Sequence, residues 1–304
     1  MWQSIVDWKM LRFGVEIEFV GDRPEELELL PGWIMSLDEH QLDETGNKSG
    51  SELKPPPMLW SQREQIRIML ARLEAQGAAA NWSCGLHVHV GLEPWGQAAV
   101  LPLLDAALQH QQALELLLQM SEHRRLFCPP VTREMRERYV AEPCAESLRH
   151  QGRPHSHRCG INTAAWFDIG TVEIRCANGS IEYGEVLNTI ELCLRFVAAV
   201  GSGGATLPSS GDPLELAAAL GAPTSGYPVQ APAPQWYTER IWLEDALIPS
   251  FMPLVQQLIP GGEVHDILPR RDGLMLTIED SNGKHHQYVV EPPASGWTVK
   301  RQLA

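Results

Sequence analysis

Three short stretches of the chain each place a pair of reactive side chains two residues apart within a run of hydrophobic residues. The pairs are Glu16 and Glu18, His87 and His89, and Glu173 and Arg175. In an extended strand, residues i and i+2 lie on the same face, about 6.6 Å apart. If the three strands share one sheet, their polar faces can converge on a site that binds metal ions and phosphate.

An ordinary solvated sheet face would account for any one of these pairs, since alternation is normal in an antiparallel sheet with one wet face. The residue types argue against this explanation for all three pairs together. Glutamate is depleted in strands, and like charges on neighbouring strands are unfavourable unless a cation lies between them. We therefore favour a single shared site.

Carboxylates, imidazoles and one guanidinium restrict the chemistry of such a site. Oxygen ligands suit Mg²⁺ or Mn²⁺ with bound phosphates, whereas imidazole also admits Zn²⁺ or Fe²⁺. Arg175 beside Glu173 favours a phosphoryl group, which a guanidinium can bind through two hydrogen bonds. The sequence has no Gly-x-x-x-x-Gly-Lys loop, so a P-loop enzyme is excluded. Metal ions and arginines would have to hold the phosphates instead.

The elements that must position these residues are short strands separated by unequal helical insertions. Strands are predicted at about 12–20, 33–38, 51–53, 86–91, 159–167 and 171–177, and helices at about 62–76, 97–122, 132–140 and 184–200. This irregular order predicts an α+β fold with a mainly antiparallel sheet. Helices would cover its apolar face and leave the polar face open.

The sequence changes character after residue 200. Residues 201–235 are rich in glycine, proline and alanine and predict a connection. Residues 236–304 predict a small accessory segment, in which a helix at about 236–258 precedes a β-hairpin. We expect residues 1–200 to form the catalytic core.

Two details of the accessory segment can be read from its residues. Pro249 and Pro253 predict breaks in its helix. An Asn-Gly turn at 282–283 predicts the hairpin. His285 and His286 lie in this hairpin, and we expect them to be ordinary hairpin residues rather than ligands.

Composition excludes several classes of partner. The net charge of −14 over 304 residues argues against a nucleic-acid backbone, whose binding needs clustered lysine and arginine. The arginines at 133, 136 and 138 either form a solvated helix face or reach an anionic ligand, with Arg138 as the candidate nucleotide contact.

We find neither a secretion signal nor an apolar run of about 18 residues that would span a membrane. Six scattered cysteines predict free thiols in a reducing cytoplasm.

The motifs that carry these residues resemble, in their order, those of the amidoligase family, which is placed with the glutamine-synthetase-like carboxylate-amine ligases. They are Phe-Gly-Val-Glu-Ile-Glu at 13–18, Glu52 before three prolines, Cys-Gly-Leu-His-Val-His-Val-Gly at 84–91, the stretch 158–162, and Thr-Val-Glu-Ile-Arg at 171–175. The likeness covers about residues 12–200, and the Cys-Gly-x-His-Val-His block is its most specific part.

The resemblance implies an antiparallel sheet that lines an ATP site with two or three divalent metal ions, Mg²⁺ or Mn²⁺. By motif position it implies five metal ligands, namely Glu16, Glu18, Glu52, His87 and Glu173, with His89 as a further ligand or a wall residue. It also implies that Arg175 contacts the transferred phosphate. Arg158 and Asn162 would lie near substrate or nucleotide. Two positions depart from the family pattern. Lys54 replaces the usual serine before the prolines, and Cys159 replaces an aromatic residue, so substrate contacts could differ.

The function expected from this resemblance is an ATP-dependent ligase that joins a carboxylate to an amine through an acyl phosphate. Glu173 and Arg175 would carry the chemistry, and the substrates would be amino acids, peptides or other small molecules. Enzymes similar to glutamine synthetase often form rings or dimers, so a homo-oligomer belongs to the same expectation. Two alternatives stay open: a zinc hydrolase that uses His87, His89 and a carboxylate, and a non-catalytic interaction protein.

Overall fold

The computed structural model of the chain divides into two compact units. It describes residues 5–21, 23–37, 41–150, 159–203, 207–280, 284–291 and 297–303. The first unit comprises the described residues up to Ala233 except His150, and the second comprises the rest. The catalytic, connecting and accessory roles expected for residues 1–200, 201–235 and 236–304 stay predictions.

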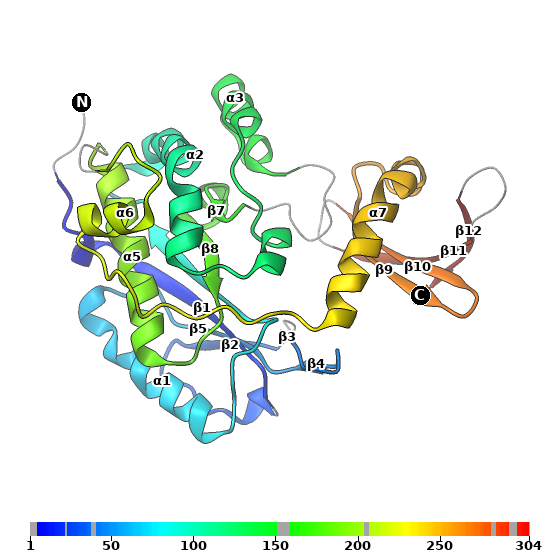
Figure 1. Cartoon of the computed structure of the whole chain (residues 1–304), viewed down its shortest axis with the longest axis horizontal. Coiled ribbons are helices and arrows are strands. Elements are labelled where there is room, and N and C mark those ends of the chain that lie inside the picture. Colours follow the sequence, from blue (N-terminus) through cyan, green and yellow to red (C-terminus); the bar gives the residue numbers. More distant parts are fainter. Residues whose placement is uncertain are drawn as a thin grey trace. The chain divides into compact units, whose positions relative to one another are not determined.

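A six-stranded sheet in the order β2-β5-β1-β6-β8-β7 forms the centre of the first unit (Figure 1). Its strands are β1 (Phe13–Phe19), β2 (Ile34–Ser36), β5 (Ser51–Lys54), β6 (Gly85–Gly91), β7 (Ile161–Asn162) and β8 (Thr171–Asn178). All neighbouring pairs are antiparallel, which confirms the predicted fold class. A separate ribbon pairs β3 (Gln41–Leu42) with β4 (Lys48–Ser49).

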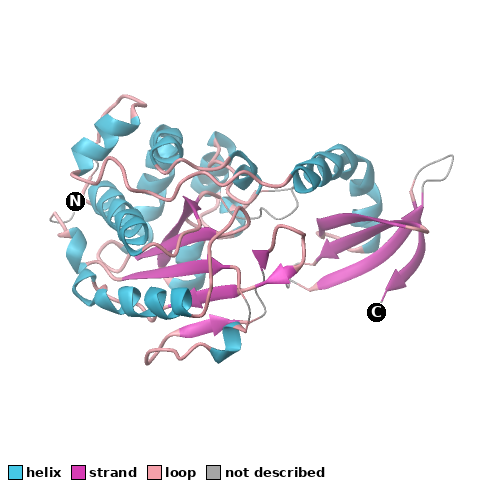
Figure 2. Ribbon diagram, turned by 60° about the horizontal axis from the view of Figure 1, so that its bottom comes forward, coloured by secondary structure: helices cyan, strands magenta, loops and turns pink. Residues whose placement is uncertain are grey.

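The first unit has six described α-helices, drawn in cyan in Figure 2, and all except the short helix at Ala165–Ile169 contribute buried residues to the core on the hydrophobic face of the sheet. They are α1 (Glu64–Ala75), α2 (Val100–Leu117), α3 (Arg133–Ala141), α4 (Ala165–Ile169), α5 (Tyr183–Gly201) and α6 (Pro213–Leu220). In β6, for example, Leu86, Val88 and Val90 are fully buried in the same core as the apolar residues of α1, α2 and α5. The alternate residues of the strand therefore face the other side of the sheet, which is left for polar groups.

Two predicted elements need correction. The strand expected at 159–167 ends at Asn162, and Ala165 begins the short helix α4. Gly170 terminates this helix with a φ of 74°, and its N–H donates to the carbonyl oxygens of Ala165 and Trp166. The helix expected from residue 97 begins at Val100, which places Pro102 in the first turn, where proline is tolerated.

The glycine- and proline-rich stretch after α5 is tied to the first unit. The side chain of Asn178 donates to the carbonyl oxygens of Gln119 and Pro228, at 2.8 and 3.1 Å. Tyr227 is only 1% exposed within the hydrophobic core. The hydrogen bond to Pro228 and the burial of Tyr227 make residues 222–233 part of the packed structure rather than a free connection.

The second unit packs one helix against a four-stranded antiparallel sheet in the order β12-β11-β10-β9. Its elements are α7 (Gln235–Leu258), β9 (Glu263–Arg270), β10 (Gly273–Glu279), β11 (His285–Glu291) and β12 (Thr298–Leu303). The hairpin of β10 and β11 is where it was predicted, although the Asn282-Gly283 turn lies outside the described residues. Neither β9 nor β12 was predicted.

The breaks expected at Pro249 and Pro253 are absent, since α7 continues through both residues. Its residues Ile248, Phe251 and Val255 are buried in the core of the second unit. Packing of this apolar face therefore outweighs the loss of two backbone donors.

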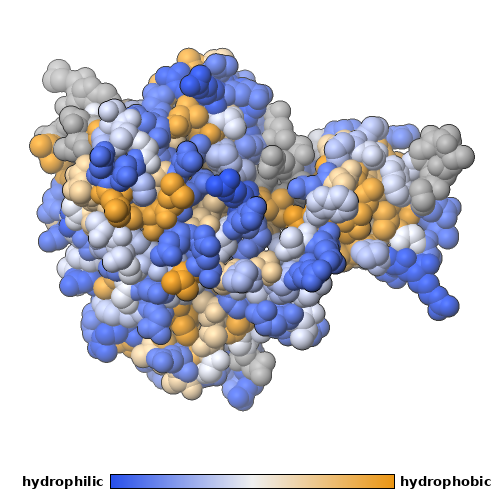
Figure 3. Space-filling view, in the orientation of Figure 1, coloured by the Kyte–Doolittle hydropathy of each residue, from blue (hydrophilic) through white to orange (hydrophobic). Residues whose placement is uncertain are grey.

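Within the described part of the chain, no helix is both long and apolar enough to cross a membrane. Figure 3 shows blue hydrophilic residues over much of the visible surface, with smaller groups of orange hydrophobic residues between them. Such scattered apolar groups are usual on a folded protein.

Candidate active site

A polar cleft of about 330 Å³ lies on the open face of the six-stranded sheet. Its lining includes eight of the residues singled out in the sequence, namely Glu16, Glu18, Glu52, His87, His89, Asn162, Glu173 and Arg175. The three alternating pairs therefore do share one face, as their spacing predicts. Their roles in binding or catalysis stay predictions.

Strand register brings the pairs together. Glu16 on β1 lies opposite His87 on β6, and Glu18 lies opposite Glu52 on β5. On the other side of β6, His89 lies opposite Glu173 on β8. Directly opposed residues on neighbouring strands are about 5 Å apart, so the donors meet without any unusual backbone conformation.

An irregularity in β8 places Arg175. Leu86 pairs with Ala177, but Val88 pairs with Ile174, so β8 contains one residue more than β6 over this interval. A bulge of this kind bends the strand and redirects its side chains. The buried guanidinium of Arg124 holds the two strands here, donating to the carbonyl oxygens of Cys84 at 2.9 Å and Arg175 at 3.1 Å.

The two histidines are surrounded by carboxylates. Nδ1 of His87 lies 3.0 Å from Glu16 Oε2, and its Nε2 lies 3.6 Å from Glu18 Oε1. Nε2 of His89 lies 3.4 Å from Glu16 Oε1 and 3.6 Å from Glu173 Oε1. The opposite ring nitrogen of His89 is 3.1 Å from the hydroxyl of Thr171, which fixes the orientation of the ring.

Glu173 is the most deeply buried acid in the cleft, with no exposed surface. Burial alone would raise its pKa, but the charge of Arg175 lowers the pKa of Glu173 to about 2. Its second oxygen accepts a hydrogen bond from the Asn162 amide at 2.7 Å. Glu173 is therefore ionised at neutral pH and holds the guanidinium of Arg175 by a direct ion pair.

The remaining carboxylates respond differently to the same cleft. Burial would raise the pKa of Glu16, but its hydrogen bond with His87 and the nearby imidazole of His89 lower it well below its ordinary value. Burial and the neighbouring charge of Glu16 raise the pKa of Glu52 to about 8. Glu52 therefore resists ionisation beside Glu16 and Glu18, which indicates an excess of negative charge in the cleft. A bound cation would neutralise part of this charge.

The donor set fits divalent metal ions. Two groups of three ligand atoms lie within 4.8 Å of one another: Glu16, Glu52 and His87 form one, and Glu16, His89 and Glu173 form the other. Nε2 of His89 is buried and makes no hydrogen bond to any described residue, so a ligand-forming nitrogen points into the cleft. Mixed carboxylate and imidazole donors suit Mg²⁺ or Mn²⁺ and also admit Zn²⁺.

Lys54 and Asp168 also line the cleft, and the sequence analysis did not place them there. Nζ of Lys54 lies 2.6 Å from Glu52 Oε2 and 3.3 Å from Glu16 Oε1. A signal for this residue was present, because Glu52 and Lys54 are a fourth pair two residues apart in a strand. Asp168 comes from α4, the helix that was predicted as a strand.

Of the other two candidate nucleotide contacts, Arg138 is not among the described residues that line the cleft. Arg138 on α3 donates to the carbonyl oxygens of Ser147 and Arg149 and pairs with Glu134. Arg158 lies outside the described residues. A nucleotide-binding role for either residue stays a prediction.

A second cleft of about 310 Å³ adjoins the first and shares Glu16, Lys54, His89 and Ile169 with it. Its wall is more apolar and includes Phe13, Pro55, Pro57 and Ile169. Arg12 and Glu93 add one charge of each sign. Two joined clefts of different polarity provide room for more than one substrate.

Comparison with known proteins gives one family match. The model of a family described as "Putative amidoligase enzyme" matches residues 27–197, more than half of the chain. No curated protein matches the sequence. Among solved structures, the chain is similar to the complex between the prokaryotic ubiquitin-like protein Pup and its ligase PafA, at 12% identity and a TM-score of 0.26. That match covers 70% of this chain and 51% of the other, so this chain spans about half of that protein's length.

Proposed function

This chain belongs to the putative amidoligase family, and from that membership we propose that it is an ATP-dependent ligase that joins the carboxylate of one substrate to the amine of another. The observation that carries the proposal is the convergence of acidic and imidazole donors with Arg175 in one cleft. We take the substrates to be amino acids, peptides or other small molecules.

The proposed reaction has two steps. A substrate carboxylate oxygen attacks the γ-phosphorus of ATP, the bond to the β,γ-bridging oxygen breaks, and ADP leaves. The substrate amine then attacks the carbonyl carbon of the acyl phosphate, inorganic phosphate leaves, and the nitrogen loses a proton. An amide bond forms at the expense of one phosphoanhydride bond.

The side chains of the cleft supply positioning and charge for this reaction. Arg175 is held by Glu173, and Asn162 holds Glu173 in turn. The guanidinium is thus preorganised to contact the transferred phosphoryl group without reorganising during the reaction. Glu16, Glu18, Glu52, His87, His89 and Glu173 would hold Mg²⁺ or Mn²⁺ ions, which, when bound, neutralise phosphate charge.

The adjoining apolar cleft is our candidate for the acid and amine substrates. Arg12 suits a substrate carboxylate and Glu93 suits a substrate ammonium group, because each carries the opposite charge. Lys54 lies in both clefts, so it would meet whichever substrate approaches Glu16 and Glu52.

Product formation tests the proposal directly. The full chain is incubated with ATP, Mg²⁺ and mixtures of amino acids and peptides, and ADP, phosphate and new amides are measured by mass spectrometry. ADP should appear only when both an acid and an amine are present. Glu173→Gln should lower its rate at least about 100-fold, while Arg67→Gln, an exposed change on α1, should leave it unchanged. ADP release that ignores both substrates would sink the proposal.

Hydrolysis by a zinc ion is the second candidate, favoured by the two imidazoles that face Glu16. His₂-carboxylate sets hold catalytic zinc in known hydrolases. Metal content and nucleotide binding distinguish the two functions. One tightly held zinc ion at this cleft, with no binding of ATP, would favour the hydrolase.

A further inference from the structure

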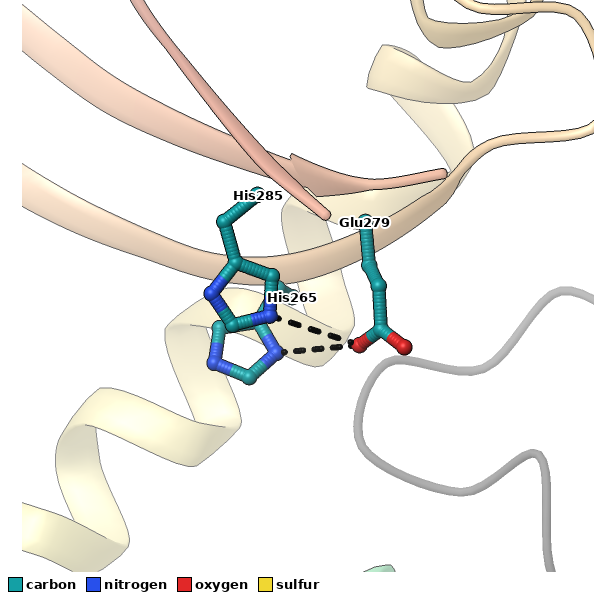
Figure 4. Close-up of side chains that lie close together, drawn as sticks. All are labelled: His265, Glu279 and His285. Carbon is teal, nitrogen blue, oxygen red and sulfur yellow. Dashed lines mark ion pairs between the residues drawn. The ribbon is translucent and has the colours of Figure 1, made fainter. Parts of the chain in front are cut away.

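A second cluster of histidine and glutamate lies in the second unit, far along the sequence from the cleft residues. His265 on β9, Glu279 on β10 and His285 on β11 come from three neighbouring strands (Figure 4). The neighbours of these residues, such as Val264 and Ile278, are buried in the core with α7. The cluster therefore belongs to the face of the sheet that α7 does not cover.

A β-bulge brings His265 to this face. Ile278 pairs with Val264, but Thr277 pairs with Asp266, so His265 is the extra residue of β9 at this point. In such a bulge two residues of one strand oppose a single residue of the other, which redirects a side chain. Glu279 and His285 need no such device, because they are directly paired on β10 and β11.

The three donors converge closely. Nδ1 of His265 and Nε2 of His285 each lie 3.5 Å from Oε2 of Glu279, as the dashed lines in Figure 4 show. The three ligand atoms all lie within 4.8 Å of one another. A tetrahedral zinc ion with bonds of about 2.0–2.1 Å keeps neighbouring donors about 3.3–3.4 Å apart. Each nitrogen is therefore within a few tenths of an ångström of the separation from the carboxylate that zinc requires.

The arrangement of the rings also favours a shared ion. The imidazoles of His265 and His285 have centroids 4.0 Å apart and planes inclined by 36°. A neutral imidazole keeps a lone pair for a metal at neutral pH, whereas two protonated rings this close would repel each other.

We propose that His265, Glu279 and His285 bind a divalent transition-metal ion, with Zn²⁺ as the ion that this set of two imidazoles and one carboxylate fits best. The ion links three strands, and two of them, β9 and β11, are not direct neighbours in the sheet. It therefore stabilises the second unit. A fourth coordination position is left for water or an external donor. The site does not depend on the proposed ligase function, because none of its ligands lies in the cleft of the first unit.

Zinc titration of the full chain against a chromogenic chelator tests this site. His285→Asn and Glu279→Gln should each weaken one zinc equivalent at least about 100-fold. His286→Asn is the matched control: this histidine is adjacent in sequence, alternates to the other face and pairs with Asp280 at 2.9 Å. It should bind zinc like the unaltered chain. Glu173→Gln should also keep this equivalent, which separates it from any zinc bound in the cleft.

Thermal denaturation provides a second readout. Zinc should raise the melting temperature of the unaltered chain and of His286→Asn, but not that of Glu279→Gln, which keeps the size and hydrogen-bonding capacity of the side chain. Circular dichroism first establishes that each variant is folded. Unchanged zinc affinity in both ligand variants, or an equal loss in His286→Asn, would overturn the assignment.

Discussion

The two units each gather histidine and glutamate on the face of an antiparallel sheet, but the two clusters differ in burial and in the charged groups around them, and we propose different roles for them. The cleft of the first unit buries Glu173 completely and sets Arg175 and Lys54 among its acids. The cluster of the second unit joins two imidazoles to one carboxylate, and its side chains are 28–46% exposed. Phosphoryl transfer needs cationic side chains beside metal-binding acids, whereas an ion that only links strands needs donors alone.

Removal of the guanidinium should have the largest effect and would sharpen this contrast. Arg175→Met should lower kcat for ADP formation at least about 1,000-fold, because the charge on the transferred phosphoryl group loses its fixed partner. Arg175→Lys keeps the charge that Glu173 needs for folding and should recover only part of the rate. In the second unit, Arg301→Met breaks an exposed pair with Asp272 and should leave kcat unchanged. Equal rates for Arg175→Lys, Arg175→Met and the unaltered chain would contradict the proposed role of the residue.

Metal removal should separate the two clusters by the ion that each prefers. Treatment with a strong chelator should abolish ligase activity and lower the melting temperature of the chain. Excess Mg²⁺ should restore activity, and one equivalent of Zn²⁺ should restore the melting temperature, because oxygen-rich and imidazole-rich sites differ in preference. Full recovery of activity with one equivalent of Zn²⁺ alone would erase this distinction.

A smaller effect is expected from Lys54. Its ammonium group neutralises Glu16 and Glu52 and so competes with a metal ion for the same carboxylates. Lys54→Met should lower the Mg²⁺ concentration for half-maximal ATP binding by about fivefold. This factor corresponds to about 1 kcal/mol, the free energy of the ion pairs that the metal ion must otherwise displace. Lys48→Met, which changes an exposed residue of β4, is the control. An unchanged or higher Mg²⁺ requirement would mean that the lysine does not compete with the metal.

The smallest predicted effect concerns Glu244 on α7, a buried acid of the second unit that belongs to neither cluster. Burial raises its pKa, although the N–H of Ile267 donates to it. Above pH 4.5, the ordinary pKa of the group, the unfolded state ionises before the folded state does. The raised pKa therefore lowers the free energy of unfolding above this pH. Below it both states are protonated, and the destabilisation vanishes. Glu244→Gln should therefore slow hydrogen exchange of β9 and β10 at pH 7 relative to the unaltered chain, and the difference should shrink near pH 4. A difference that grows as pH falls would contradict this sign.

The cleft was predictable because its information is local. A period of two between buried and polar residues determines which face each side chain takes, and burial of one face fixes the register of β1, β6 and β8. Glu16, His87 and Glu173 could thus be brought together before any pairing was known. Lys54 follows the same rule, because it lies two residues after Glu52 on the same face of β5. It was missed because the three prolines after it led us to end the predicted strand at residue 53.

The second cluster could not be found in this way. His265 and His285 are separated by 20 positions in a region with no likeness to the family motifs, and the sequence led us to expect that His285 is an ordinary hairpin residue. The position of His265 depends on a bulge in β9, a strand that was not predicted. A one-residue irregularity in a ladder leaves no periodic signal, so only the paired strands reveal it. The helix α4 was missed for a related reason, since five residues are too few to establish a helical period.

Asn178 and Tyr227 have a practical consequence for dividing the protein. A polypeptide that stopped at Gly201, where the composition changes, would lose the tyrosine that fills the core and the carbonyl of Pro228 that Asn178 binds. The exposed cavity and the loss of one of the hydrogen bonds of the Asn178 amide would both favour unfolding. Expression of the first unit alone should therefore retain every residue to Ala233. Loss of activity on shorter truncation would indicate a destabilised fold rather than a missing substrate-binding segment.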